Sequence, residues 1–244
     1  MKAMIFAAGI GSRLKPFTDF HPKALAPVKG VPALELVIKK LKAAGIAEMV
    51  VNVHHFSDQV KRFISDNDGF GCDIKIADES CQLLDTGGGL LNAQDLFGND
   101  GEPILLHNAD IVTDFSVEMM MKEHERSGAD VTLMAACRNS SRMLYFDDES
   151  ALRGWKNLST GQTKPESLDE SRFRALAFGG VHIVNPRIFA LLGDYATLHG
   201  KVFSIMPFYL EVLPLLNIRG YVPSQPFKWH DIGTPGKLEA ANNG

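Results

Sequence analysis

The chain has 244 residues, with 25 Lys and Arg against 29 Asp and Glu, so its formal net charge is −4. A chain of this length buries roughly 70% or more of its unfolded surface, so folding requires neither a disulfide nor a structural metal. The hydrophobic fraction of 45% is typical of globular proteins and excludes wholesale disorder, collagen and coiled coils. The negative net charge argues against nucleic acid as a partner, because nucleic-acid-binding domains are usually basic.

The cysteines and the N-terminus indicate where the protein resides. The chain has three cysteines, an odd number, and Cys72, Cys81 and Cys137 lack the spacing of metal ligands. This pattern indicates reduced thiols, as in cytoplasmic proteins. No apolar run is long enough to span a membrane. The short apolar N-terminus is followed by Arg13 and Lys15, where a signal peptide would be cleaved. We therefore expect a cytoplasmic protein with no membrane partner, and the sequence leaves the oligomeric state open.

Strand and helix patterns alternate through the first half of the chain. Strands are expected at residues 1–8, 49–53, 73–77, 103–106 and 131–136, and the first two are expected to be buried. Amphipathic helices are expected to begin at Pro32, at Ser57, at the glycines 87–89 and near Ser116. Such alternation predicts an α/β fold of the Rossmann-like type, with a mostly parallel sheet and helices on both of its faces.

The second half of the chain is less regular. We expect a hairpin of residues 143–146 and 151–155, a polar loop at 157–174, a strand at 176–184, helices at 186–192 and 203–216, and a turn with a final helix at 229–241. This pattern indicates a single domain over residues 1–244. Residues 1–136 form its nucleotide-binding core, residues 137–228 form an appended region for a second ligand, and residues 229–244 form the last turn and helix.

Polar and glycine residues follow the first strand, at the edge of a parallel sheet where ligands bind. The backbone N–H groups of Ala8, Gly9 and Gly11 can form an anion-binding nest there. The guanidinium of Arg13 can bond two phosphate oxygens, and Lys23 supplies a point charge ten residues later. The loop therefore predicts a phosphate site.

Two other phosphate-binding loops do not fit this spacing. A dinucleotide-binding loop needs a third glycine where the chain has Leu14, and a nicotinamide oxidoreductase also needs an acidic residue at the next strand end, where the chain has His54. A Walker A loop needs Gly-Lys-Ser or Gly-Lys-Thr, which the chain lacks. His54 and His55 do not form a metal pair, because adjacent strand residues point in opposite directions. His107 is expected to be a hydrogen-bonded histidine at a strand end.

The full run of fixed positions resembles a known signature. Residues 9–23 match Gly-x-Gly-x-Arg-x-x-Pro-x-Thr ending in Pro-Lys, the signature of the sugar-1-phosphate nucleotidyltransferases. Similarity to that family continues in order at residues 84–89, 108–110, 179–180 and 229–235. The details are most similar to short bacterial members related to N-acetylmuramate-1-phosphate uridylyltransferase and to proteins labelled mannose-1-phosphate guanylyltransferase.

This resemblance implies a reaction and a set of roles. A nucleotidyl group passes from a nucleoside triphosphate to a sugar-1-phosphate, and pyrophosphate leaves. Asp110 and Asp231 are expected to bind Mg²⁺, Arg13 to steady the β- and γ-phosphates, and Lys23 to stabilise charge near the α-phosphate. Substrate contacts are expected from Ala8, Gly9, Gly11, Thr86, Gly88, Asn108, Lys156 and Gly180.

One family position is ambiguous in this chain. Many members carry Glu-Lys-Pro, whose lysine binds the sugar phosphate, but this chain has Thr163-Lys164-Pro165 without the glutamate. Lys156 is the alternative that we favour, because Trp155 can anchor it beside the predicted hairpin. Either lysine could serve, or neither.

A different class of function is a catalytically silent module that binds a nucleotide or an NDP-sugar. Loss of Arg13, Lys23, Asp110 or Asp231 would favour that module, and all four are present. UTP and GTP are the leading nucleotides. The sugar is left open among hexose-1-phosphates such as mannose-1-phosphate and N-acetylmuramate-1-phosphate.

Overall fold

The computed structural model describes residues 1–244. Its helices are α1 (Ala33–Ala43), α2 (Ser57–Asp66), α3 (Asp85–Asn92), α4 (Val117–Ser127), α5 (Ile188–His199), α6 (Ile205–Glu211) and α7 (Pro235–Asn243). Its strands are β1 (Lys2–Phe6), β2 (Pro27–Val28), β3 (Val31–Pro32), β4 (Glu48–Val53), β5 (Asp73–Asp78), β6 (Ile104–Asn108), β7 (Ile111–Thr113), β8 (Val131–Ala136), β9 (Arg142–Phe146), β10 (Leu152–Asn157), β11 (Thr163–Lys164), β12 (Arg174–Val184), β13 (Ile218–Tyr221) and β14 (Trp229–Asp231).

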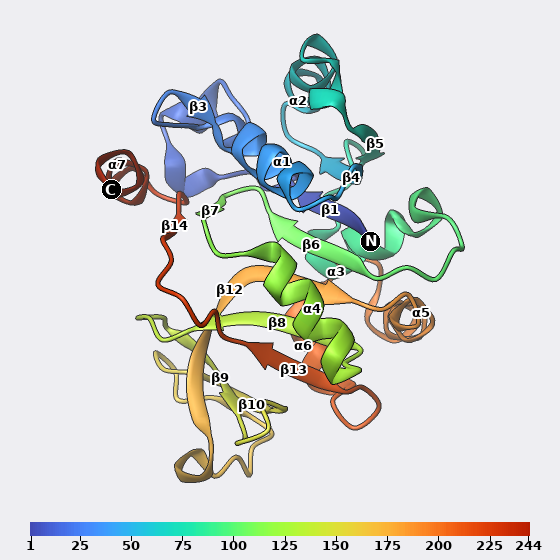
Figure 1. The fold of residues 1–244 in the computed structure, drawn as a ribbon, viewed down its shortest axis with the longest axis vertical. Helices are drawn as coiled ribbons and strands as arrows, with labels where there is room; N and C mark the ends of the chain where they lie inside the picture. Colours follow the sequence, from blue (N-terminus) through green and yellow to red (C-terminus); the bar gives the residue numbers. More distant parts are fainter.

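A parallel sheet forms the centre of the molecule (Figure 1). Strands β5, β4, β1 and β6 are neighbours in that order, and all three pairings are parallel. Strands β4, β1 and β6 are short apolar runs whose side chains are buried on both faces, as parallel strands covered by helices require. Strand β5 lies at the edge of the sheet, and only its Ala77 is buried. The predicted α/β class is confirmed, and the carboxyl ends of β1, β4 and β6 lie at one edge of the sheet.

The long strand β12 joins this sheet to a second one. It pairs antiparallel with β6 and β8 along its second half and with β9 at its start. Strands β9, β10 and β11 continue from there as the predicted hairpin with one added strand. The register of β12 against β8 shifts between Phe178 and His182, a bulge that contains the glycines 179 and 180.

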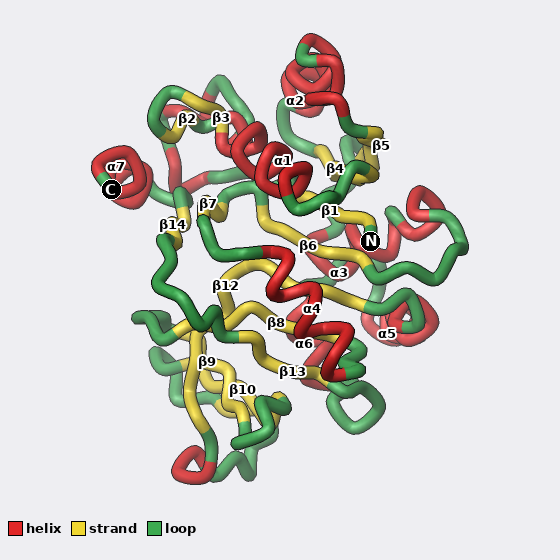
Figure 2. The backbone as a smooth tube through the Cα atoms, viewed as in Figure 1, coloured by secondary structure: helices red, strands yellow, loops and turns green.

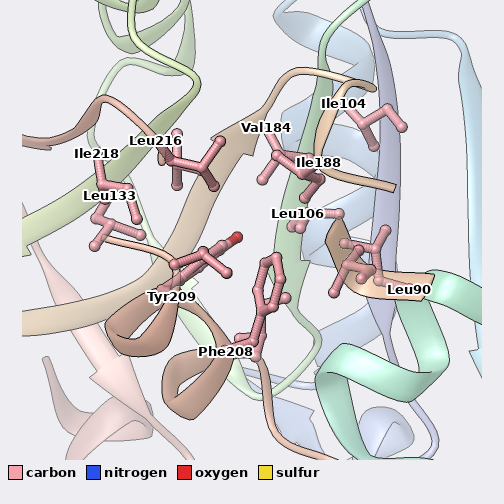
Figure 3. Close-up of a cluster of buried hydrophobic side chains, with 14 of the residues drawn as sticks. Leu90, Ile104, Leu106, Leu133, Val184, Ile188, Phe208, Tyr209, Leu216 and Ile218 are labelled. Carbon is pink, nitrogen blue, oxygen red and sulfur yellow. The ribbon is translucent and has the colours of Figure 1, made fainter. Parts of the chain in front are cut away.

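Helices cover both faces of the central sheet (Figure 2). Helices α1, α2 and α4 pack on one face around a cluster of buried side chains that includes Val37, Ile38 and Met120. Helices α3, α5 and α6 pack on the other face, where Leu90, Phe208 and Tyr209 are fully buried (Figure 3). No helix is both long enough and apolar enough to cross a lipid bilayer.

Two helices differ in length from the expectation. Helix α5 runs through Gly193 to His199 rather than ending near Leu192, because Gly193 keeps helical geometry and the left-handed φ comes only at Gly200. Helix α6 covers only Ile205–Glu211 of the predicted 203–216. Pro214 lacks the backbone N–H that a continuing helix would require.

The structure also corrects the extended segments. The region 157–174, expected to be a loop, contains β11, which pairs with Trp155 and Lys156. Residues 229–231, expected to be part of a turn, form β14 and pair with β7. Strands of two or three residues carry no period that a sequence can reveal, and β7 and β14 exist only because they pair with each other.

Candidate active site

A cleft of about 450 Å³ opens at the carboxyl ends of β1, β4 and β6. Eight of the residues predicted to serve the substrates or the metal line it: Ala8, Gly9, Gly11, Arg13, Lys23, Thr86, Asn108 and Asp110. They come from the loop after β1, the start of α3 and the loop after β6. The fold thus collects residues that are distant in sequence at one edge of the sheet.

The loop after β1 folds back on itself at Gly11. Its φ of 69° lies in the left-handed region, and a Cβ there would meet the Lys23 Cβ and the Thr18 methyl group, each at 2.9 Å. Thr18 Oγ1 donates a hydrogen bond to the Gly11 carbonyl at 2.9 Å. The glycine and the threonine of the signature therefore hold Lys23 against the anion-binding loop.

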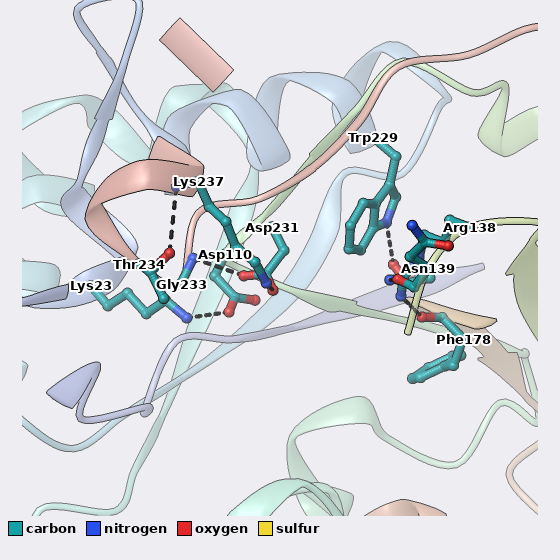
Figure 4. A network of polar contacts seen from close by, with 11 residues as sticks. Lys23, Asp110, Arg138, Asn139, Phe178, Trp229, Asp231, Gly233, Thr234 and Lys237 are labelled. Carbon is teal, nitrogen blue, oxygen red and sulfur yellow. Dashed lines mark hydrogen bonds and ion pairs between the residues drawn. The ribbon is translucent and has the colours of Figure 1, made fainter. Parts of the chain in front are cut away.

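Asp110 and Asp231 reach the same place from different strands (Figure 4). Lys23 Nζ donates to Asp110 Oδ2, and β14 lies beside β7 with the Ile232 N–H bonded to the Asp110 carbonyl at 3.0 Å. A Cβ on Gly233 would lie 2.7 Å from Asp231 Oδ1 and 3.1 Å from Lys23 Nζ. Asp231, Lys23 and Arg13 thus surround Gly233, and Lys23 joins this group to Asp110. Gly233 lines the cleft, although Asp231 itself does not.

Lys237, which the sequence reasoning missed, pairs with Asp231. Its Nζ lies 2.5 Å from Asp231 Oδ2, and the Gly233 N–H donates to Asp231 Oδ1 at 2.7 Å. Burial by itself would raise the pKa of Asp231, but these two hydrogen bonds and the charge of Lys237 lower it below the ordinary value. Asp231 is therefore held as a carboxylate.

The two carboxylates fit a hard divalent cation. Both supply oxygen, and each already holds a lysine ammonium, so each carboxylate position accommodates a positive charge. The structure contains no group of three or more His, Cys, Asp or Glu side chains that could hold a metal ion. A cation at this place would therefore complete its shell with water and substrate oxygens, as Mg²⁺ commonly does.

A buried network links the anion-binding loop to the loop before α3. Asn52 Oδ1 accepts from the Ala7 N–H at 2.8 Å, and Asn52 Nδ2 donates to Glu79 Oε1 at 2.7 Å. Glu79 Oε2 accepts from the Leu84 N–H at 3.0 Å. Burial raises the pKa of Glu79 above its ordinary value. Polar residues at the ends of β4 and β5 are the sequence signal that indicates this network.

Helix α3 is held in place by the segment between α5 and α6. The N–H groups of Gly87 and Gly88 donate to the Phe203 carbonyl at 2.9 and 3.1 Å, and Thr86 Oγ1 accepts from the Ile205 N–H at 2.9 Å. Thr86 lines the cleft. Gly88 lies beneath it, against the Lys201 carbonyl.

Three other predicted residues lie elsewhere. Gly180 does not line the cleft, although a Cβ there would come within 3.2 Å of Asn108 Nδ2. Lys156 Nζ bonds Glu170 at 2.5 Å within the second sheet, and Lys164 lies on β11 beyond it. The structure brings neither lysine into the cleft.

His107 and His54 each form a hydrogen bond between Nδ1 and a backbone carbonyl. His107 is fully buried, with Nδ1 bonded to the Asn108 carbonyl at 2.9 Å, but its Nε2 has no hydrogen-bond partner in the chain. Burial lowers the pKa of His107 to about 4. His54 Nδ1 bonds the Glu79 carbonyl at 2.6 Å, and His54 does not line the cleft.

Comparison with known proteins adds to this geometry. The family model described as "Nucleotidyl transferase" matches residues 2–244. The chain is 30% identical over 248 residues to an N-acetylmuramate alpha-1-phosphate uridylyltransferase of Caulobacter vibrioides, covering 98% of this chain and 94% of the relative. It is 31% identical over 244 residues to mannose-1-phosphate guanylyltransferase 1 of Arabidopsis thaliana, covering 96% of this chain and 62% of the relative.

Solved structures share the fold. A putative glucose-1-phosphate thymidylyltransferase of Bacillus anthracis superposes with a TM-score of 0.83 at 18% identity, covering 100% of this chain and 94% of that one. HddC of Yersinia pseudotuberculosis superposes with a TM-score of 0.72 at 18% identity, covering 99% and 98%. The matching family model and the relatives confirm the resemblance carried by residues 9–23, and the chain belongs to the nucleotidyl transferase family of enzymes.

Proposed function

We propose that the protein transfers a nucleotidyl group from a nucleoside triphosphate to a sugar-1-phosphate in the presence of Mg²⁺, giving an NDP-sugar and pyrophosphate. The observation that carries this proposal is the meeting of Arg13, Lys23 and Asp231 around Gly233, with Asp110 joined to them through its ion pair with Lys23. Two cations and two carboxylates in one place suit a reaction that brings several phosphates together.

The chain's own groups have separate tasks in this proposal. The backbone of Ala8, Gly9 and Gly11 binds the triphosphate, and Arg13 holds the β- and γ-phosphates and the departing pyrophosphate. Lys23 lies between the anion-binding loop and Asp110, where it stabilises the charge that develops at the α-phosphate. When bound by Asp110 and Asp231, Mg²⁺ supplies charge neutralisation of the phosphate oxygens.

The remaining contacts follow the two sides of the cleft. Thr86 contacts the base in this proposal, with Gly88 packed behind it, and Asn108 contacts the sugar, with Gly180 packed against Asn108. The ion pair of Lys156 with Glu170 argues against a direct contact with substrate, so we assign the sugar phosphate to neither Lys156 nor Lys164. The three free cysteines are compatible with the cytoplasmic location that we expect.

Uridine and guanosine triphosphates are the nucleotides that we favour. Two relatives that match nearly the whole chain are named a uridylyltransferase and a guanylyltransferase, and their names give N-acetylmuramate-1-phosphate and mannose-1-phosphate as acceptors. Main-chain groups form much of the cleft wall at Ala8, Gly9 and Gly11 and do not by themselves discriminate between these bases.

The test is pyrophosphate release by the purified protein with Mg²⁺, across four nucleoside triphosphates and a panel of sugar-1-phosphates. We expect release that requires one base and one acceptor. If no combination releases pyrophosphate while a triphosphate still raises the unfolding temperature, the protein is a nucleotide-binding module rather than an enzyme. If no triphosphate binds at all, the proposal is wrong.

A further inference from the structure

Arg138 is a partly buried cation with no carboxylate partner. It follows β8 by two residues, and its guanidinium carbon lies 3.8 Å from the centre of the Trp229 ring. One of its amino groups donates to the Phe178 carbonyl at 2.5 Å and the other to the Asn139 carbonyl at 3.4 Å, whereas the buried Nε has no partner in the chain. It forms none of the ion pairs in the structure, although burying an unpaired charge is costly.

The strand order places Arg138 beside the reaction centre. Strands β6 and β8 both pair antiparallel with β12, so they run in the same direction and end at the same edge of the sheet. Asp110 follows β6 and Arg138 follows β8. Trp229 and Asp231 are alternate residues of β14 and point to the same side, so the arginine that stacks on Trp229 lies on the side of the strand that carries Asp231.

Arg138 lies on the side away from the nucleotide cleft. The cleft is lined by the loop after β1, by Asn52 of β4, by residues that follow β5 and β6, and by Gly233, whereas β8 lies beyond β6 and β12 in the sheet. Figure 4 shows Arg138 and Trp229 together on one side of the Asp110–Asp231 pair and Lys23 on the other. In-line transfer requires the attacking group to approach from the side opposite the leaving pyrophosphate.

The side chains of Trp229 and Arg138 are held in fixed positions. Trp229 Nε1 donates to the Gly179 carbonyl at 2.8 Å, next to the carbonyl of Phe178 that Arg138 bonds. The stack and the two carbonyl contacts fix the plane of the guanidinium, so little side-chain entropy is lost when a ligand binds. Each of the two amino groups donates one N–H to a carbonyl and keeps a second, and a fixed guanidinium with unused N–H groups selects oxyanions.

We propose that Arg138, held on Trp229, binds anionic oxygens of the acceptor substrate. This inference rests on the proposed function, since that function supplies the acceptor. The anion is either the phosphate that every acceptor carries or an acidic substituent on its sugar ring. Both sources present the same oxyanion chemistry to the guanidinium, and they are separated by the choice of acceptor.

The test uses acceptor pairs that differ in one acidic group. Glucose-1-phosphate is compared with glucuronate-1-phosphate, and N-acetylglucosamine-1-phosphate with N-acetylmuramate-1-phosphate, at saturating triphosphate. The variants are Arg138→Met, which keeps the apolar stem, and Arg138→Lys, which keeps the charge. Arg142→Met is the matched control, because Arg142 is exposed on the same connection and its side chain makes no hydrogen bond or ion pair.

We expect Arg138→Met to raise KM for the recognised acceptor about tenfold or more with little change in kcat, since one charge-assisted hydrogen bond is lost. A rise confined to the acidic member of each pair identifies a sugar substituent, and an equal rise for both members identifies the phosphate. Arg138→Lys should recover part of the loss. Unchanged KM values in Arg138→Met would overturn the proposal and leave the arginine as a support for Trp229.

A binding measurement separates this inference from the proposed function. The chain has two tryptophans, so Trp229 is the single reporter in a Trp155→Phe protein. Addition of an acceptor without triphosphate should change its emission, and Arg138→Met should abolish that change. Such a response in a protein that releases no pyrophosphate would retain the anion site and contradict the transfer reaction. The absence of both pyrophosphate release and an emission response would contradict both proposals.

Discussion

Lys237 stands where a cation is normally disfavoured. It lies in the first turn of α7, whose N-terminal dipole favours negative charge, and that turn contains no acidic residue. Its ion pair with Asp231 offsets this cost. Because the same carboxylate is one of our two proposed Mg²⁺ ligands, a divalent ion has to displace the lysine ammonium.

Replacing Lys237 should therefore strengthen metal binding. We expect Lys237→Met to bind Mn²⁺ about fivefold more tightly than the wild type in the absence of nucleotide, because a partly exposed ion pair contributes about 1 kcal/mol. Free Mn²⁺ is measured by electron paramagnetic resonance. Lys237→Arg keeps the charge and should behave as the wild type. Equal Mn²⁺ affinity in all three proteins would mean that the ion pair does not compete with the metal.

The carboxylates themselves should matter far more for turnover. We expect Asp110→Asn and Asp231→Asn each to lower kcat by at least about 100-fold, since metal-assisted charge stabilisation contributes several kcal/mol. Pyrophosphate release measures the effect, and thermal unfolding checks the fold. The exposed Asp148→Asn is the control. Near wild-type Mg²⁺-dependent activity in either site variant would remove that residue from the metal site.

At the scale of single elements, α3 depends on contacts rather than on helix propensity. Three consecutive glycines are poor helix formers, yet residues 87–89 are helical and buried. A Cβ on Gly88 would lie 2.1 Å from the Lys201 carbonyl, and one on Gly87 would lie 2.4 Å from the Phe203 ring. The glycines let the segment between α5 and α6 close against the helix.

Adding one methyl group to this helix should separate the two segments. We expect Gly88→Ala to destabilise the protein by about 1–3 kcal/mol and to raise KM for the triphosphate, because Thr86 is bonded to the displaced segment. Gly193→Ala is the matched control in α5, where a Cβ would meet no atom within 4 Å, and it should stabilise by about 0.5–1 kcal/mol. Urea unfolding measures both. Equal stability of the two variants would contradict the packing argument.

At the scale of the whole molecule, buried histidines on β6 and β12 link stability to pH. Burial lowers the pKa of His107 to about 4 and that of His182 to about 3. Neither ring nitrogen of His182 has a hydrogen-bond partner in the chain, and the ring packs between Phe178 and Tyr209. In the unfolded chain both histidines take up a proton near pH 6.5.

Stability should therefore fall as the pH decreases from about 6.5 toward 4, because the unfolded state binds more protons in that range. Each histidine contributes about 1.4 kcal/mol per pH unit, and above pH 7 neither contributes a slope. We expect His182→Phe to remove the contribution of His182 from this slope and to leave those of His107 and of His124, whose pKa burial also lowers, as measured by urea unfolding between pH 7 and 4.5. The substitution removes no hydrogen bond, because neither ring nitrogen of His182 has a partner in the chain. An unchanged slope would mean that His182 is protonated in the folded protein.

Much of the fold follows from patterns that are local in the sequence. Short apolar runs predicted β1 and β4, and the 3.6-residue period predicted α1. The alternation of such segments was enough to predict parallel strands, because a strand–helix–strand unit returns the chain in the same direction. The short strands β7 and β14 and the lengths of α5 and α6 depended on partners elsewhere in the chain and were not predicted.

The sequence by itself determined the kind of chemistry: the signature at residues 9–23 and the carboxylates Asp110 and Asp231 indicated the family that the comparisons confirm. The tertiary structure alone decided which side chains meet. Pairing of β14 with β7 brings Asp231 to Asp110, and it also brings Lys237 and the Arg138–Trp229 stack to the same edge, while Lys156 is paired away from it. The physical reason is that residue types and their spacing are local properties of the sequence, whereas a site is built by packing between segments that are far apart in the chain.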